Sequence, residues 1–212
     1  MSATTRYQKL CIALQNYLHG AKYYTALRAY DLGRNNHTGF RKDKITPEFQ
    51  HQVEIALFIT TLRGVEDEEG AIVVALLHDT LEDINHITSQ YIGNIIGSKY
   101  IMPIERISKS INGLSTFDTF DDYFHRISVC PIASVVKGSD RIHNLSTMIG
   151  VFTPEKQQAY VHETEKYFLP MLKTASNLHP MQYLAYMNIR TILKTQVNLV
   201  KAGLAGYDLD HK

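Results

Sequence analysis

The fold is decided by residues 71–83, which read AIVVALLHDTLED. The first seven of these residues are all apolar, so a helix formed here would be hydrophobic on every side. Such a helix belongs inside a helical protein, because no face of it is suited to water. Asp67, followed by Glu68 and Glu69, supplies the acidic first turn that favours a helix start. We therefore expect a central helix that begins near Asp67 and continues through Asp83.

Start and stop signals divide the rest of the chain into further helices. Capping residues, prolines at first helical positions and glycines after last turns mark the helix ends. They predict helices over residues 47–62, 88–97, 103–113, 131–150, from 154 onward and 180–204, followed by a frayed tail at 207–212. Series of short alternating runs joined by hairpin turns, which would indicate a sheet, do not occur. The sequence predicts an all-α protein, a compact multi-helix bundle, with one domain over residues 1–206.

Composition narrows the class of protein. The 22 lysines and arginines nearly balance the 21 aspartates and glutamates, so nothing favours a nucleic-acid partner. Cys11 and Cys130 lie far apart and form no C-x-x-C pair, which argues against a zinc ribbon or a secreted disulfide framework. No stretch reaches the 18 apolar residues of a membrane span. We expect a soluble cytoplasmic protein without a membrane partner.

The predicted central helix ends in a cluster of charged residues, although the rest of it is apolar. His78 and Asp79 follow the apolar run directly, and Glu82 and Asp83 come one turn later. Three carboxylates near a helix C-terminus repel one another and oppose the helix dipole. An exposed acidic helix end with one core histidine is the simpler interpretation, but a bound cation would remove the repulsion. The run HDTLED therefore favours a metal site.

Two other predicted helices carry polar side chains on an inward face. His51 shares its face with apolar residues at i+4, i+7 and i+8, which points the imidazole toward the core. In the helix from Pro131, one stripe holds Asp140, His143 or Asn144, and Thr147. A polar stripe on an apolar helix indicates the wall of a site.

A basic loop lies between the first helices. Residues 36–44 read NHTGFRKDK and include Arg41, Lys42 and Lys44. Arginine forks and lysine point charges suit phosphate oxygens, although such a loop is more often simply solvated.

Taken in this order, these segments resemble the hydrolase domain of the RelA/SpoT-type alarmone enzymes, within the HD phosphohydrolase superfamily. The resemblance covers residues 21–172. It rests on the basic loop at 37–42, the histidine at 51, the run A-L-L-H-D-T-x-E-D at 75–83 and the run K-x-x-D-R-x-H-N-L at 137–145. The chain departs from the family's pattern at Gln52, where the family has proline.

The resemblance implies a set of roles for individual residues. It implies metal ligands for one Mn²⁺ ion at His51, His78, Asp79 and Asp140. It implies that Glu82 and Asp83 orient or activate the attacking water. It implies phosphate contacts at Arg41, Lys42 and Lys137, and sugar or nucleotide contacts at Asn144 and Thr147. A single ion is favoured because no extra histidine pair accompanies the HDTLED run.

The resemblance also implies a reaction: removal of the 3′-pyrophosphate of (p)ppGpp, which leaves GDP or GTP. Two alternatives remain open at this point. The first is an HD phosphohydrolase that acts on another nucleotide, such as a ppApp-type alarmone, NADPH or a nucleoside monophosphate. The second is a module that binds alarmones without turnover. A homo-oligomer also remains open, since the helix at 180–204 can cover the core or form a dimer seam.

Overall fold

The structure, a computed structural model, describes residues 3–210 and confirms the all-α prediction. The α-helices are α1 (Ala3–Ala21), α2 (Tyr24–Asn36), α3 (Gln50–Ile59), α4 (Glu68–Leu77), α5 (Thr80–Asp83), α6 (Ser89–Ile96), α7 (Ile101–Ile107), α8 (Phe120–Ser128), α9 (Pro131–Thr147), α10 (Pro154–Glu163), α11 (Leu169–Leu178) and α12 (Tyr183–Asp210). Shorter elements are the 3₁₀ turns η1 (Ser98–Tyr100) and η3 (Pro180–Gln182), the π-helical turn η2 (Thr164–Phe168) and the two-residue strands β1 (Ser110–Ile111) and β2 (Leu114–Ser115).

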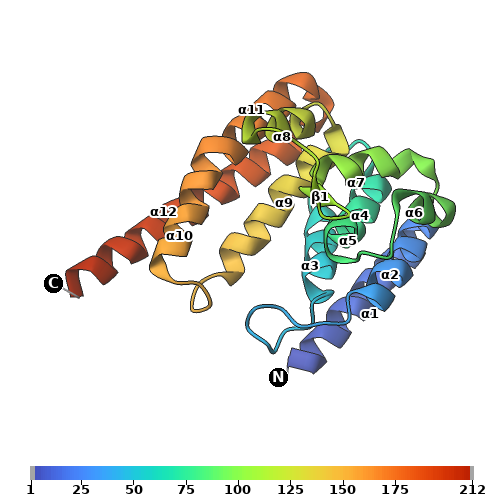
Figure 1. Cartoon of the computed structure of the whole chain (residues 1–212), viewed down its shortest axis with the longest axis horizontal. Helices are drawn as coiled ribbons and strands as arrows, with labels where there is room; N and C mark the ends of the chain where they lie inside the picture. Colours follow the sequence, from blue (N-terminus) through green and yellow to red (C-terminus); the bar gives the residue numbers. More distant parts are fainter. Residues whose placement is uncertain (1–2, 211–212) are drawn as a thin grey trace.

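Helix α9 lies between two groups of helices (Figure 1). On one side it contacts α3 and α4, which in turn pack against α1 and α2. On the other side it contacts α11 and the long α12. A cluster of buried apolar residues runs from Cys11 in α1 to Val200 in α12. This arrangement brings the HDTLED segment and the polar stripe of α9 together.

The apolar run forms the central helix α4, as predicted. The Asp67 side chain caps it by accepting a hydrogen bond of 2.8 Å from the Gly70 amide. Every residue from Gly70 to Leu77 is buried. The prediction of one continuous helix through Asp83 was wrong, because α4 ends at Leu77 and the separate short helix α5 follows. At this break the His78 ring bonds to the backbone of the last helical turn.

The helix predicted from residue 47 to 62 begins later and ends earlier than expected. The Thr46 hydroxyl does not cap it, because this hydroxyl donates to Asp43 Oδ2 at 2.5 Å. Pro47 forms a bridge with Phe40 instead of opening the helix. Helix α3 therefore runs from Gln50 to Ile59.

The prediction for residues 103–113 was also wrong in part. Helix α7 ends at Ile107, and β1 and β2 then form a small antiparallel hairpin. Asn112 and Gly113 form its turn, with φ values of 53° and 76°. Asn-Gly is the residue pair that two-residue hairpin turns favour, because both positions need positive φ.

Three of the other start signals are confirmed, whereas the helix predicted over 131–150 ends at Thr147 and the helix predicted from 180 starts at Tyr183. Thr88 caps α6 and Thr153 caps α10 through their side chains, and Pro131 is the first residue of α9. Helix α12 continues to Asp210, beyond the predicted end at Leu204. The last two residues of the predicted tail, 211 and 212, lie outside the described residues. Within the described part of the chain, no helix has the length and apolar character needed to cross a membrane.

Candidate metal centre

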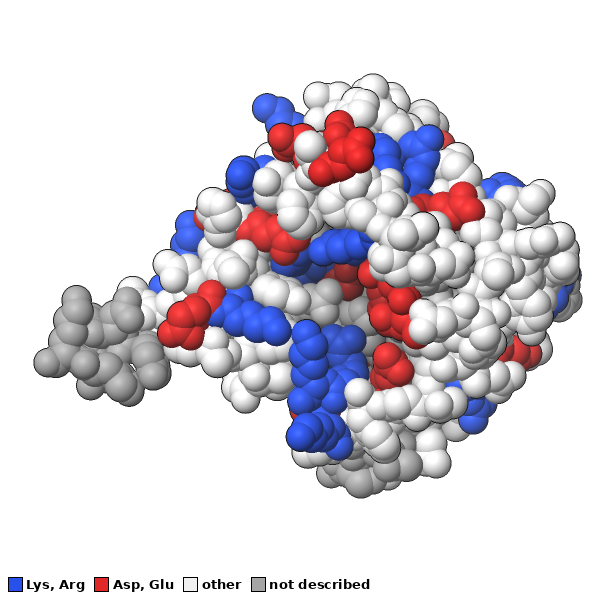
Figure 2. Space-filling view, viewed as in Figure 1, with Lys and Arg blue, Asp and Glu red and all other residues white. Residues whose placement is uncertain are grey.

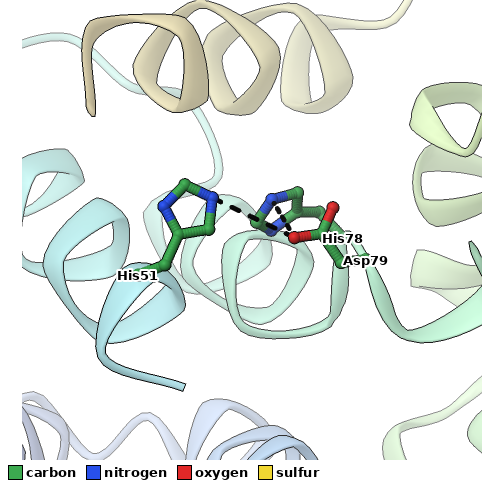
Figure 3. A group of neighbouring side chains, drawn as sticks. All are labelled: His51, His78 and Asp79. Carbon is green, nitrogen blue, oxygen red and sulfur yellow. Dashed lines mark ion pairs between the residues drawn. The ribbon is translucent and has the colours of Figure 1, made fainter. Parts of the chain in front are cut away.

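The four predicted metal ligands lie together although they come from three separate parts of the chain. His51 Nε2 lies 3.1 Å from Asp140 Oδ1 and 4.0 Å from Asp79 Oδ2. His78 Nε2 lies 3.1 Å from Asp79 Oδ2 and 3.8 Å from Asp140 Oδ1. Figure 3 shows both rings directed at the Asp79 carboxylate. Ligand atoms of His51, His78 and Asp79 all lie within 4.8 Å of one another, and Asp140 borders both rings, an arrangement that suits a divalent cation.

The His78 ring presents one nitrogen to this group of ligand atoms. Its Nδ1 lies 2.8 Å from the carbonyl oxygen of Ala75, so Nδ1 carries the proton and donates it. Its Nε2 is buried and makes no well-aligned hydrogen bond, although Asp79 Oδ2 lies 3.1 Å away. In the metal-free protein the raised pKa of His78 places a proton on Nε2 facing this carboxylate, and a metal ion would replace that proton between the two atoms. The residues present therefore fit a metal ion.

A chain of hydrogen bonds orients His51. His143 Nε2 lies 2.6 Å from Glu54 Oε2, and His143 Nδ1 lies 2.8 Å from His51 Nδ1. Because the ionised Glu54 carboxylate only accepts, His143 donates at Nε2. The tautomers of the two rings set the direction of the bond between the Nδ1 atoms. When His51 donates from Nδ1, its Nε2 has a lone pair directed at Asp140 and Asp79.

Burial and charge shift the titration of the cluster. Burial lowers the pKa of His51 to about 4, which keeps this ring neutral. Burial opposes a charge on His78 as well, but Asp79 and Asp140 outweigh it and raise the pKa of His78 to about 9. Burial would also raise the pKa of Asp79, yet His78 holds it below its ordinary value. The Asp79 and Asp140 carboxylates thus favour a positive charge between them. A metal ion would therefore compete with the proton of His78 for the Nε2 atom.

The two acids predicted to handle water border this cluster. Glu82 Oε1 accepts a hydrogen bond of 2.5 Å from the backbone amide of Lys109. Asp83, the last residue of α5, is exposed. Partial burial, together with Asp79 and Glu48, raises the pKa of Asp83 to about 6.

The cluster opens into a polar cleft of about 610 Å³. In Figure 2, basic and acidic side chains face each other across a hollow near the middle of the face shown. All the predicted site residues except His78, which is buried, line the cleft. They are Arg41, Lys42, His51, Asp79, Glu82, Asp83, Lys137, Asp140, Asn144 and Thr147.

The predicted nucleotide contacts lie at different places in the cleft. Arg41 Nη2 donates to Asn144 Oδ1 at 3.2 Å, so the basic loop reaches across to α9. Lys137 is buried, and its Nζ lies 3.3 Å from Asp140 Oδ2. Lys42 lies over the ring of Phe152 with its Nζ 5.0 Å from the ring centroid. The basic residues therefore approach the cluster from both the loop and the helix.

The sequence analysis missed several residues that line the cleft or support it. They are Glu54, which bonds to His143, and the cleft residues Lys109, Arg141 and Glu163. Arg141 Nη2 donates to Glu163 Oε2 at 2.5 Å. Of these, Arg141 lies inside the run K-x-x-D-R-x-H-N-L, which could have identified it. Glu163 opens the run E-T-x-x-Y at 163–167, which also resembles the family, whereas no motif marks Glu54 or Lys109.

The fold and the cluster together define a class of all-α protein whose histidine and aspartate side chains can hold a divalent metal ion. The cleft around this group is lined by both basic and acidic side chains. No protein-family model matches the chain. It is similar to GTP pyrophosphokinase rsh of Brucella melitensis, with 27% identity over 157 residues, 68% of this chain and 19% of that protein. It is also similar to the guanosine-3′,5′-bis(diphosphate) 3′-pyrophosphohydrolase of Aquifex aeolicus, with 29% identity over 147 residues, 68% of this chain and 20% of that protein.

These relatives confirm the resemblance to RelA/SpoT-type proteins that the motifs indicated. The chain spans about a fifth of the length of the two relatives described here. The names of these relatives describe whole proteins, and the matched region is a minor part of each.

Proposed function

We propose that this chain is a metal-dependent hydrolase that removes the 3′-pyrophosphate of (p)ppGpp and releases GDP or GTP and pyrophosphate. The observation that supports this best is the group of His51, His78, Asp79 and Asp140 next to Glu82 in one cleft. The Aquifex aeolicus relative carries the name of this activity. The Brucella melitensis relative is named for pyrophosphate transfer, so hydrolysis rather than synthesis is part of the proposal.

The first part of the proposal concerns the metal ion. His51, His78, Asp79 and Asp140 hold one divalent cation, for which we propose Mn²⁺, because mixed imidazole and carboxylate ligands suit it. The buried Nε2 of His78, which faces the Asp79 and Asp140 carboxylates at 3.1 and 3.8 Å, supports this assignment. When bound, such a cation lowers the pKa of a water molecule and so supplies a nucleophile near neutral pH.

The second part concerns the proton and the bonds. Glu82 or Asp83 positions the water and takes its proton while the water oxygen attacks the phosphorus atom bound to the ribose 3′ oxygen. The bond between this phosphorus and the 3′ oxygen breaks, the 3′ oxygen gains a proton, and pyrophosphate leaves. The pKa of about 6 at Asp83 suits proton exchange near neutral pH. Glu82 is held in place by the Lys109 amide.

The third part concerns substrate binding. Arg41, Lys42 and Lys137 contact phosphate oxygens, because they line the cleft and carry the positive charge that phosphates need. Asn144 and Thr147 lie one turn apart on α9 and contact the sugar or nucleotide. A nucleotide is the only partner in this proposal. A cytoplasmic setting belongs to it too, because Cys11 and Cys130 are both free thiols.

Product analysis tests the proposed reaction. The Mn²⁺-loaded protein is incubated separately with ppGpp, pppGpp, ppApp and NADPH, and the products are separated by anion-exchange chromatography. We expect GDP and pyrophosphate from ppGpp, and no turnover by Asp79→Ala. A parallel incubation with GTP and ATP tests for synthesis.

The other outcomes separate the alternatives. Turnover of ppApp or NADPH alone would keep the metal site and move the substrate to another nucleotide. Tight ppGpp binding without turnover would support a binding module. Full activity in metal-free protein would contradict the proposal.

A further inference from the structure

A second group of potential metal ligands lies beside the first. It consists of His37, just after α2, Glu48, just before α3, and Asp83, the last residue of α5. One ligand atom from each of the three lies within 4.8 Å of the others. Asp79 precedes α5 and Asp83 ends it, so a single helical turn connects the two groups.

His37 is the central residue of this second group. Its side chain is almost fully buried, with 3% of the residue exposed. Its Nε2 lies 3.3 Å from the hydroxyl oxygen of Thr80, which is itself buried. Its Nδ1 lies 4.0 Å from Glu48 Oε1, is buried and has no hydrogen-bond partner. Whichever way the bond to Thr80 runs, Nδ1 stays 4.0 Å from the carboxylate and makes no hydrogen bond to it, and a cation between the two atoms would give both of them a partner.

The two carboxylates of the group lack a basic partner. Among the ion pairs of residues 3–210, Glu48 pairs with His37 alone and Asp83 takes part in none. The Glu48 backbone amide bonds to the carbonyl of Gly39, which fixes the start of this side chain near His37. Two acidic groups and one buried ring nitrogen thus converge without a positive charge to balance them.

We propose that His37, Glu48 and Asp83 form a second cation site, which binds a divalent first-row transition-metal ion. One imidazole and two carboxylates favour such an ion over Mg²⁺ or Ca²⁺, which prefer oxygen ligands alone. The ligand count leaves room for water or for a bound anion.

The second site lies in the same cleft as the first group, so its ion could contact the same bound molecule. Glu48 and Asp83 both line the cleft that contains the first group. An ion held there would face the same bound molecule as an ion at His51 and His78, and two metal ions in one cleft share the charge of a phosphate group. This inference goes beyond the proposed function and does not depend on which nucleotide is bound. It assigns Asp83 to metal binding and therefore leaves Glu82 as the acid that takes the proton of the attacking water. It also revises the expectation of a single ion, which considered histidine pairs along the sequence only.

Counting bound Mn²⁺ tests the proposal. The whole chain is treated with a chelator, Mn²⁺ is added in steps, and the signal of free aqueous Mn²⁺ is followed by electron paramagnetic resonance. We expect two equivalents bound by the wild-type protein. We expect one equivalent in His37→Ala, one in Glu48→Gln and one in His51→Ala, and none in the double variant His37→Ala/His51→Ala.

A control variant and a second site variant distinguish the loss of a metal ligand from the loss of folding. Glu155→Gln removes a carboxylate that is fully exposed in α10 and should still bind two equivalents. Circular dichroism checks that each variant is folded. If His37→Ala does not fold, Glu48→Gln decides, because it keeps the size of a side chain that is a third exposed.

Two results would overturn the second site. One is that the wild-type protein binds a single equivalent of Mn²⁺ and that His51→Ala binds none. The other is a second equivalent that survives in both His37→Ala and Glu48→Gln. Either result leaves the proposed function intact, whereas loss of both equivalents in His51→Ala alone would contradict independent sites.

Discussion

The Nδ1 atoms of His51 and His143 lie 2.8 Å apart, and this contact links the candidate metal cluster to Glu54 in α3. His143 has no place among the proposed ligands. Its hydrogen bond nevertheless selects which nitrogen of His51 keeps a lone pair. Partners of this kind fix the ring orientation of metal-binding histidines and raise their basicity.

Replacing His143 should therefore weaken metal binding without removing a ligand. We expect His143→Ala to lower the affinity for Mn²⁺ by about 10- to 100-fold, the range found for such second partners. Isothermal titration calorimetry on the folded variant measures it. His162→Ala, which removes an exposed histidine of α10, is the control and should bind as the wild type does. An unchanged affinity in His143→Ala would show that His51 is oriented by packing alone.

Replacing Asp79 and replacing Glu82 should have different effects on metal binding, although both should lower turnover. Asp79→Ala removes a proposed ligand of the first group and should abolish ppGpp hydrolysis together with metal binding at that group, while one equivalent stays at the second group. Glu82→Gln keeps an oxygen for the Lys109 amide but removes the charge, so metal should remain while kcat falls by about 10²- to 10⁴-fold. Metal analysis and initial rates on the same preparations check both. Wild-type turnover by Glu82→Gln would remove this residue from the mechanism.

The ionised Asp83 carboxylate should lower the free energy of unfolding of the metal-free protein near neutral pH. Its pKa in the fold is about 6 because of burial, Asp79, Glu48 and Glu82, whereas the unfolded value is about 3.9. An acid whose pKa is raised by folding destabilises the fold once it ionises. Stability is therefore lost as pH rises from about 4 through 6.

Asp83→Asn tests this sign. In chelator-treated protein at pH 8, we expect it to raise the free energy of unfolding by about 1 kcal/mol, a value reduced because the exposed carboxylate is screened by solvent. The gain should vanish near pH 4, where Asp83 is protonated in both states. Urea unfolding at several pH values measures it. An equal gain at pH 4 and pH 8 would mean that charge is not the cause.

The close approach of α2 to α4 should not tolerate a methyl group. A Cβ at Gly33 would lie 2.5 Å from Phe49 Cε2 and 2.8 Å from the Leu76 carbonyl oxygen. We expect Gly33→Ala to lower the free energy of unfolding by about 1–3 kcal/mol through overpacking.

Gly20 in α1 provides the matched control, because a Cβ there would meet nothing within 4 Å. Gly20→Ala should raise stability by about 0.5–1 kcal/mol, since alanine is the better helix former. Urea unfolding compares the two variants. A neutral Gly33→Ala would show that Phe49 and the backbone of α4 shift easily.

The sequence by itself determined the helical class and several of the helix starts. Asp67, Thr88 and Thr153 cap their helices through bonds to amides within three residues, so local sequence is sufficient there. The apolar run after Asp67 predicted the central helix for the same local reason. Thr46 failed as a cap because its hydroxyl bonds to Asp43 instead, within a loop whose shape depends on the Phe40–Pro47 bridge.

Much of the candidate site could also be predicted, since HDTLED places its charges beside an apolar run and α9 carries its polar stripe at helical spacing. The rest required the tertiary structure. Glu54 meets His143, 89 residues away, only because α3 packs against α9. Asp83 meets His37 and Glu48 only because α4 ends at Leu77 and the chain turns into α5. Spacing predicts neighbours within one helix, whereas contacts between helices depend on how their buried faces pack.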